Sequence, residues 1–146
     1  MQSMDPYLIF DGNCGEAMSF YEQTLGGTME TFMTVKESPA AAHCPPGTGD
    51  QIMHACLLFD GDRRLMASDS LGNGKHEGMK GFSVAIAYPD VRKAEQVFAA
   101  LTSGGSVHMP MGKTFWAESF GMGVDRFGTP WFVSGGLKPG ARDDIW

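Results

Sequence analysis

An internal repeat of one strand, one helix and three further strands constrains the fold of this chain more than any other feature. Residues 14–25 and 90–103 each carry apolar side chains at helical spacing, follow a short strand-like run and end at a pair of glycines. Three strand-like runs then follow each helix. The pattern predicts two βαβββ modules, at residues 5–69 and 82–136, within a single α+β domain spanning residues 1–146.

The two halves also align residue by residue along their helices. The matched positions all carry side chains of the apolar stripe: Ala17 with Ala94, Phe20 with Val97, and Tyr21 with Phe98. A helix with one apolar stripe buries that stripe against one face of a sheet. We therefore expect two curved mixed sheets with the helices on their convex faces, which leaves each concave face free to enclose a ligand.

Polar residues mark the start of each predicted helix. Asn13 is followed three residues later by Glu16, a variant of the capping box, and Asp90 directly precedes the second apolar stripe. Both residue types accept hydrogen bonds from the free backbone N–H groups of a first helical turn. We expect the side chains of Asn13 and Asp90 to cap the two helices.

The stretch at residues 116–133 predicts a β-hairpin. Its two arms, at 119–125 and 131–134, contain the aromatic and β-branched residues that strands favour. Between the arms, Gly128 can adopt a positive φ. Pro130 has no backbone donor, so it suits a turn or the first residue of a strand.

Composition excludes several classes of partner. The chain has 146 residues and a formal net charge of -6 at pH 7, and its Lys and Arg residues do not cluster, which argues against nucleic acid. No window approaches the roughly 18 apolar residues of a membrane span, and the first residues carry no leader pattern. Cys14, Cys44 and Cys56 are odd in number and widely spaced, as reduced thiols would be. We expect a cytoplasmic protein with no membrane partner.

Three runs of sequence resemble one known family. The runs PYLIFDGNCGEAMSFY at residues 6–21, LMASD at 65–69 and FW followed by GMGVDRFGTPW at 115–131 are similar to PhnB-like proteins of the glyoxalase, bleomycin resistance and dioxygenase (vicinal oxygen chelate) superfamily. The resemblance implies a glyoxalase-like fold, a small-molecule ligand and a homodimer that closes its cavities by pairing modules. Some members are labelled 3-demethylubiquinone-9 3-methyltransferase.

The resemblance also bears on metal binding. Metal enzymes of this superfamily take their ligands from the first and last strand of each module. Here those positions carry side chains that bind Zn²⁺, Ni²⁺ or Fe²⁺ poorly: Pro6, Met66, Ser83 and Phe132. A shift of one residue brings forward four others: Tyr7, Ala67, Val84 and Val133. These do not make a standard site either, so we expect no metal and no other cofactor.

Three residues are candidates for a general acid or base: His54, Glu118 and Asp69. His54 lies within a strand, so it is either a hydrogen-bonded structural residue or part of a cavity. Glu118 is either a solvent-exposed residue at the end of a buried strand face or a carboxylate that orients a ligand. Asp69 either points away from the face of Met66 and Ser68 or leaves the strand. The other histidines, at positions 43, 76 and 108, lie in polar segments typical of solvated surface.

The expected ligand site combines aromatic and thioether surface with a few polar groups. Its residues are Trp116, Glu118, Phe120, His54, Met66, Ser68, Ser83 and Phe132. Strand alternation places Trp116 and Phe120 on one face with Glu118, as a core or as a binding surface. Trp116 would add one N–H donor to orient a ligand, its alternative being a core anchor. The loop at 36–50, rich in Pro and Gly, should form no regular element and should cover the ligand.

Two functions remain open at this point. The protein is either a small-molecule-binding protein or an enzyme, a lyase or dioxygenase, that uses His54, Glu118 or Asp69. Binding is favoured, because no nucleophile–base pair or carboxylate pair stands out. The methyltransferase label finds no support, because the chain is too short to hold a cofactor-binding Rossmann unit beside two βαβββ modules.

Overall fold

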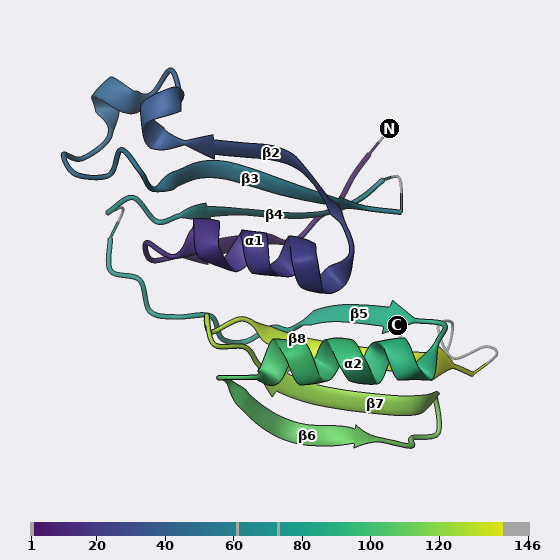
Figure 1. Ribbon diagram of the computed structural model, residues 1–146. Coiled ribbons are helices and arrows are strands. Elements are labelled where there is room, and N and C mark those ends of the chain that lie inside the picture. The colour runs from purple at the N-terminus through teal and green to yellow at the C-terminus, as the bar shows by residue number, and fades with distance from the viewer. Residues whose placement is uncertain (1, 61, 73, 139–146) are drawn as a thin grey trace. The chain divides into compact units, whose positions relative to one another are not determined.

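The computed structural model describes residues 2–60, 62–72 and 74–138. Contacts within the chain divide it into two compact units, Met1–Gly78 and Met79–Trp146, and each unit holds one of the predicted modules. Within the described residues there are two α-helices and eight strands, and the strands form two mixed four-stranded sheets, one per unit (Figure 1). This arrangement confirms the predicted α+β class and its repeat.

The first unit contains one helix and four strands. Their bounds are β1 (Tyr7–Phe10), α1 (Cys14–Leu25), β2 (Thr28–Thr34), β3 (Ile52–Phe59) and β4 (Arg63–Asp69). The strand order is β1-β4-β3-β2, with β1 parallel to β4 and the other pairs antiparallel. Helix α1 covers one face of this sheet with its buried side chains: Cys14, Ala17, Met18, Tyr21 and Leu25. The helix ends at Gly26, whose φ of 86° only glycine adopts readily.

The predicted cap of α1 is wrong, because a more distant carboxylate takes its place. The Asn13 side chain makes no capping hydrogen bond. Asp69, at the end of β4, accepts hydrogen bonds through Oδ1 from the backbone N–H groups of Gly12 (2.8 Å) and Cys14 (3.0 Å), and through Oδ2 from that of Ile52 (2.8 Å). Asp69 therefore ties the start of α1 to β3 and β4.

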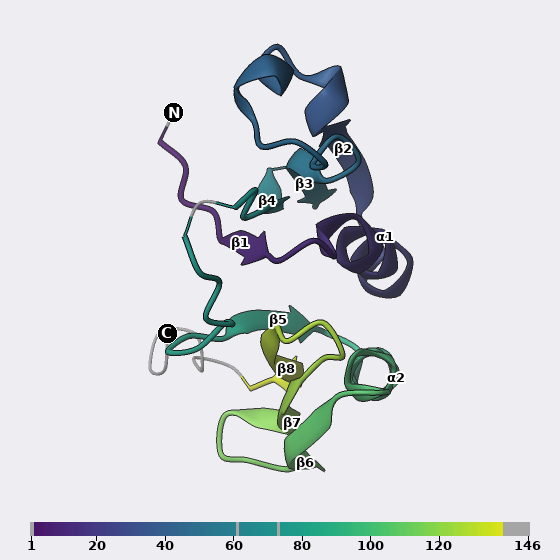
Figure 2. The same ribbon diagram turned by 90° about the vertical axis from the view of Figure 1, so that its left-hand side faces the viewer.

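The second unit repeats the arrangement. Its elements are β5 (Val84–Tyr88), α2 (Val91–Thr102), β6 (Ser106–Gly112), β7 (Ala117–Val124) and β8 (Pro130–Leu137). The strand order is β5-β8-β7-β6, with β5 parallel to β8, and α2 covers one face (Figure 2). The predicted cap is confirmed here, because Asp90 Oδ1 accepts a hydrogen bond from the Arg92 N–H at 2.9 Å.

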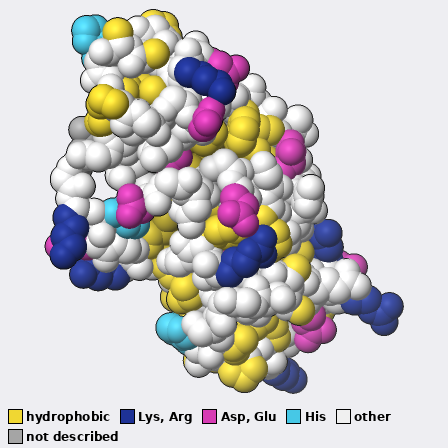
Figure 3. Space-filling view, turned by 60° about the vertical axis from the view of Figure 1, so that its left-hand side comes forward, with side chains coloured by type: hydrophobic (Ala, Val, Ile, Leu, Met, Phe, Trp, Pro, Cys, Tyr) yellow, Lys and Arg dark blue, Asp and Glu magenta, His cyan; other side chains and the backbone are white. Residues whose placement is uncertain are grey.

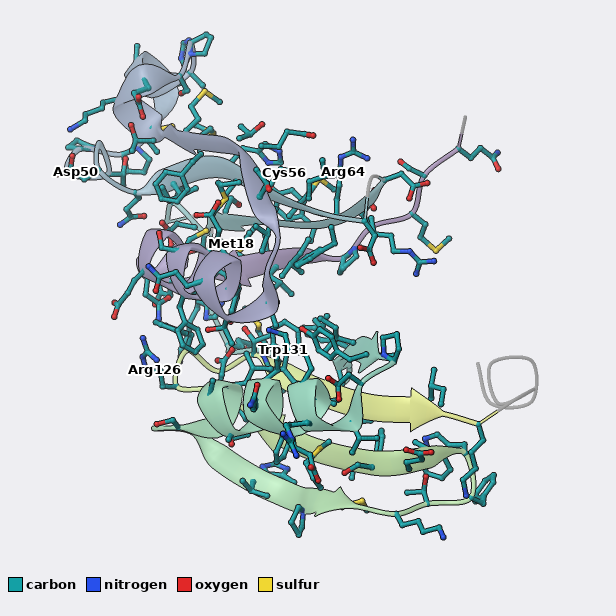
Figure 4. All side chains as sticks on the ribbon, turned by 45° about the vertical axis from the view of Figure 1, so that its right-hand side comes forward. Met18, Asp50, Cys56, Arg64, Arg126 and Trp131 are labelled. Carbon is teal, nitrogen blue, oxygen red and sulfur yellow. The ribbon has the colours of Figure 1, made fainter. Side chains whose placement is uncertain are left out.

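Strands β7 and β8 form the predicted hairpin. Gly128 has a φ of 95° and Pro130 is the first residue of β8, as expected. Asp125 organises the turn: its Oδ1 accepts from the N–H groups of Phe127 (2.9 Å) and Thr129 (3.0 Å), and its Oδ2 from Trp131 Nε1 (2.8 Å). Trp131, labelled in Figure 4, is 1% exposed, so this carboxylate–indole bond lies in the core.

The glycines of the hairpin let α2 pack close to the sheet. A Cβ on Gly121 would lie 3.0 Å from the Phe98 ring, and one on Gly123 would lie 2.6 Å from Thr102 Cγ2. A Cβ on Gly135 would lie 2.7 Å from the Ala94 Cβ. The Gly-rich run therefore serves helix–sheet packing.

The loop between β2 and β3 is more regular than predicted. It contains two short 3-10 helices, η1 (Val35–Glu37) and η2 (Ala41–His43). Its ends are joined by a backbone hydrogen bond from the Lys36 N–H to the Gly49 carbonyl (3.0 Å) and by an ion pair between Lys36 Nζ and Asp50 Oδ1 (2.7 Å). Short local bonds of this kind suffice for 3-10 turns, so the Pro and Gly content did not prevent them.

Candidate functional site

Each sheet has one face that its own helix leaves uncovered. In β7 the odd-numbered side chains face α2: Ser119 Oγ donates to Glu95 Oε2 of the helix at 3.3 Å, and Gly121 lies against Phe98. Since side chains alternate along a strand, the even-numbered residues face the other way. The predicted shared face of Phe120 with Trp116 and Glu118 is thus the helix-free face of the second sheet.

Aromatic rings form a continuous row on this face. The ring centroids of Trp116 and Phe120 are 5.1 Å apart, and those of Phe120 and Phe132 are 5.6 Å apart, both in edge-to-face geometry. Phe115 adds a fourth ring, 4.7 Å from Trp116, and is 78% exposed. We name the rings of Phe115, Trp116, Phe120 and Phe132 the aromatic row. Met122 extends the apolar surface, because it pairs with Phe132 across the strands.

Hydrogen bonds fix the segment that carries Trp116. Thr114 Oγ1 accepts from the backbone N–H groups of Trp116 (3.3 Å) and Ala117 (3.1 Å). Lys138 donates to the Trp116 carbonyl through its N–H (2.9 Å) and to the Thr114 carbonyl through Nζ (3.0 Å). The turn before β7 therefore holds its aromatic side chains in a defined position.

The polar candidates around the aromatic row differ in their placement. Glu118 is exposed, and its Oε2 lies 2.8 Å from the point where a Cβ on Gly136 would stand. Ser83 lies outside the sheet, because β5 begins at Val84. The residue of β5 that pairs with Phe132 is Ala85.

The helix-free face of the first sheet carries a different chemistry. Tyr7 Oη and His54 Nδ1 are 3.0 Å apart, and the two rings stack with centroids at 5.6 Å and an interplanar angle of 22°. His54 is half-buried and Tyr7 is exposed. This contact was not predicted from the sequence, because Tyr7 lies in β1 and His54 in β3, and β4 separates these two strands in the sheet. Only the register of β1, β4 and β3 reveals the pair.

Met66 and Ser68 lie beside this pair, as their spacing predicted. Met66 pairs with Tyr7 across the parallel strands, and Ser68 pairs with Ile9. Met66 is half-buried, whereas Ser68 is 9% exposed. The structure therefore brings His54, Met66 and Ser68 together on the first sheet, while Trp116, Phe120 and Phe132 gather on the second.

A charged group lies further along the first sheet. Arg64 Nε contacts Glu30 Oε1 at 3.4 Å, and Cys56 Sγ lies 3.9 Å from the same oxygen (Figure 4). Burial, followed by the negative charge of Glu30, raises the pKa of the Cys56 thiol. A thiol with a raised pKa forms little thiolate at neutral pH, so Cys56 is a poor nucleophile.

Asp69 is placed as a structural residue. It is 3% exposed, and both of its oxygens accept backbone hydrogen bonds at the start of α1 and β3. Both oxygens are therefore occupied by backbone donors and shielded from a substrate. Among the three acid–base candidates, His54 and Glu118 remain reachable.

The metal-ligand positions expected from the resemblance do not hold suitable donors. Pro6 precedes β1, and the residue of β1 that pairs with Met66 is Tyr7. The corresponding pair of the second unit is Ala85 and Phe132. Across residues 2–60, 62–72 and 74–138, no three His, Cys, Asp or Glu side chains gather closely enough to hold a metal ion. These residues do not fit a standard Zn²⁺, Ni²⁺ or Fe²⁺ site.

His76 differs from the solvated residue expected in its segment. Its Nε2 lies 2.8 Å from the Ile9 carbonyl, which can only accept, so Nε2 carries the proton. Its Nδ1 then accepts from the Gly78 N–H at 3.2 Å. His76 thus ties the segment after β4 to the outer edge of β1, a structural role.

Two further observations concern surface charge and helix length. On the face drawn in Figure 3, Lys and Arg side chains are scattered among Asp and Glu rather than gathered in one patch. Within the part of the chain that the structure describes, neither α-helix has the length and apolar character needed to cross a membrane.

Comparison with known proteins places these features in context. A family model described as the Glyoxalase/Bleomycin resistance protein/Dioxygenase superfamily matches residues 3–133. Protein YjdN of Escherichia coli (strain K12) is 32% identical over 139 residues, which cover 90% of this chain and 93% of YjdN.

Solved structures give the same picture. Protein PA1353 from Pseudomonas aeruginosa has a TM-score of 0.85 at 47% identity, with 92% of this chain and 98% of that chain covered. A PhnB protein from Bacillus cereus that carries the name 3-demethylubiquinone-9 3-methyltransferase has a TM-score of 0.76 at 24% identity, with 92% and 99% covered. At that identity the likeness concerns the fold and not the activity.

Proposed function

The chain belongs to the glyoxalase/bleomycin resistance protein/dioxygenase superfamily, and from this membership we propose that it is a small-molecule-binding protein whose ligand lies against the aromatic row of the second sheet. The observation that carries the proposal is the row itself: four rings in successive contact on a face that α2 does not cover. We further propose that no metal takes part, because the superfamily's ligand positions hold unsuitable donors.

Three rings of the row, those of Phe115, Trp116 and Phe132, form a preformed surface over the fourth, because Phe120 is only 4% exposed. Aromatic rings provide a large apolar area at a low cost in side-chain entropy, and edge-to-face contacts fix their orientation. Removing about 100 Å² of such a surface from water gives a transfer term of roughly 2.5 kcal/mol, from which the entropic cost of association is subtracted. The exposed carboxylate of Glu118 on the same face would orient a polar group of the ligand.

A thermal-shift screen of metabolites and antibiotics tests the proposal. A compound that raises the melting temperature and is recovered unchanged supports binding. Phe115→Ala should then weaken its binding by roughly two- to tenfold, the value of one aromatic contact. Phe32→Ala is the matched control, because Phe32 is also an exposed ring, at 44%, but lies in β2 of the first sheet. Equal effects of the two variants would contradict a site on the aromatic row.

The alternative function, an enzyme, has one observation in its favour. The hydrogen bond between Tyr7 Oη and His54 Nδ1 gives the imidazole an oriented partner, as general acids and bases often have. Under this alternative a screened compound would be consumed, and His54→Ala or Glu118→Gln would abolish its consumption while the variant stays folded. A compound returned intact by the wild-type protein argues against it.

Three further expectations belong to this proposal. We propose a cytoplasmic homodimer, and light scattering at micromolar concentration that gave only monomer mass would contradict the dimer. We propose that the loop at 36–50 helps to cover the ligand. Its proteolysis should then slow at saturating ligand, and an unchanged cleavage rate would count against a lid. We do not propose the methyltransferase activity named for the Bacillus cereus protein, because no feature described above supports it for this chain.

A further inference from the structure

The two tryptophans of the second unit differ in how their indole N–H groups are satisfied. Trp131 Nε1 donates to the buried carboxylate of Asp125 at 2.8 Å. Trp116 Nε1 is also shielded from solvent, yet it has no hydrogen-bond partner among residues 2–60, 62–72 and 74–138. Trp116 as a whole is half-buried. A ligand acceptor reaches the shielded nitrogen only when a neighbouring side chain moves aside, and the Phe115 ring, which contacts Trp116 and is 78% exposed, has room to move.

A shielded donor without an acceptor opposes folding, because the donor loses its bonds to water and gains none. Nearly all such groups in native proteins have a partner, and an orphan calls for an explanation. The two rings that contact the Trp116 indole, those of Phe115 and Phe120, offer no lone pair as an acceptor. A core anchor would not need the nitrogen, and Phe would fill the position at a lower cost.

We infer that Trp116 Nε1 is a specificity-determining donor, and that the ligand is a flat, mainly apolar compound with a neutral hydrogen-bond acceptor, such as a ketone oxygen or a ring nitrogen. This inference rests on the proposed function, since it names the ligand class of the same face. The aromatic row would bind the flat apolar part of the ligand. The formal net charge of -6 disfavours an anionic acceptor.

A matched pair of probes isolates the hydrogen bond. 1-Indanone and indane share a flat bicyclic frame and differ by one carbonyl group. Titration of the ¹⁵N-labelled full chain, followed through indole N–H resonances, gives both affinities. We expect 1-indanone to bind roughly two- to tenfold more tightly than indane, the value of one neutral hydrogen bond. The Trp116 N–H resonance should move with the ketone, while that of Trp131 serves as the internal reference.

Trp116→Phe keeps an aromatic ring but removes the donor together with the five-membered ring of the indole. Both probes then lose some ring contact, so the ratio of the two affinities is the measurement that matters. We expect this ratio to fall to about one, whereas Phe115→Leu, which removes a neighbouring ring and no donor, should keep the wild-type ratio. An unchanged ratio in Trp116→Phe overturns the inference.

The outcomes separate this inference from the proposed function. Equal binding of both probes by the wild-type protein refutes the donor role and leaves the aromatic row as a binding surface. Failure of both probes to move any resonance of the second unit contradicts the binding surface, and the inference with it.

Discussion

Replacing Asp69 with Asn should destabilise the first unit strongly, although the change removes no apolar contact. The carboxylate accepts three backbone hydrogen bonds, two through Oδ1 and one through Oδ2, and it is 3% exposed. An amide keeps one acceptor oxygen. If that oxygen retains the bonds from Gly12 and Cys14, the amide NH₂ faces the Ile52 N–H, and two donors then meet.

The size of the effect follows from the lost bond. A hydrogen bond to a charged group contributes about 1.5–3 kcal/mol, and a buried donor left without a partner costs about 1–3 kcal/mol. The contribution of the hydrogen bond already includes part of the cost of the unpaired donor, so the two are not simply added. We expect the free energy of unfolding to fall by about 2–4 kcal/mol. That is a large share of the roughly 5–15 kcal/mol by which domains are stable.

Urea unfolding followed by circular dichroism measures the loss, and amide exchange locates it. The N–H of Ile52 should exchange faster in Asp69→Asn than in the wild-type protein. Asp62→Asn is the control, because Asp62 is exposed in the turn between β3 and β4 and should cost less than about 0.5 kcal/mol. Equal stability of the two variants would refute the structural role of Asp69.

Four other predictions follow from the structure. Gly105→Ala should cost more than about 2 kcal/mol in urea unfolding, because its Cβ would lie 2.0 Å from a backbone oxygen, whereas Gly112→Ala, whose nearest atom is 3.8 Å away, should cost less than half as much. Burial, and then the charge of Asp69, raise the pKa of the Cys14 thiol well above its ordinary value, so a disulfide reagent should modify the half-buried Cys44 first; prior reaction at Cys14 would contradict this. Burial raises the pKa of Tyr88 to about 12, so the unfolded chain releases this proton first, and stability should fall between about pH 10 and 12 less in Tyr88→Phe than in the wild-type protein. Elemental analysis should find no stoichiometric Zn²⁺, Ni²⁺ or Fe²⁺, and one metal per chain would restore the lyase or dioxygenase alternative.

Local patterns in the sequence predicted most of the fold. The helix at 14–25 was placed with the bounds that the structure shows, because its apolar spacing and its glycine stop are both local signals. The hairpin of β7 and β8 followed equally from turn chemistry at Gly128 and Pro130. Alternation along one strand also placed Trp116 and Phe120 on a common face, and their ring contact agrees with it.

Features set by pairing between distant strands could not be predicted. The cap of α1 comes from Asp69 and not from Asn13, because the strand order brings the end of β4 to the start of the helix. The contact between Tyr7 and His54 depends on the register of three strands. Ser83 was placed on a strand that begins one residue later, at Val84.

The position of a bound ligand tests the proposed site most directly, and a crystal structure of the protein with the strongest compound from the thermal-shift screen would show it. We predict the compound against Trp116, Phe120 and Phe132, with an acceptor atom within hydrogen-bond distance of Trp116 Nε1 and no metal between protein and ligand. A compound bound on the α2 side of the sheet, or held through a metal ion, would contradict it.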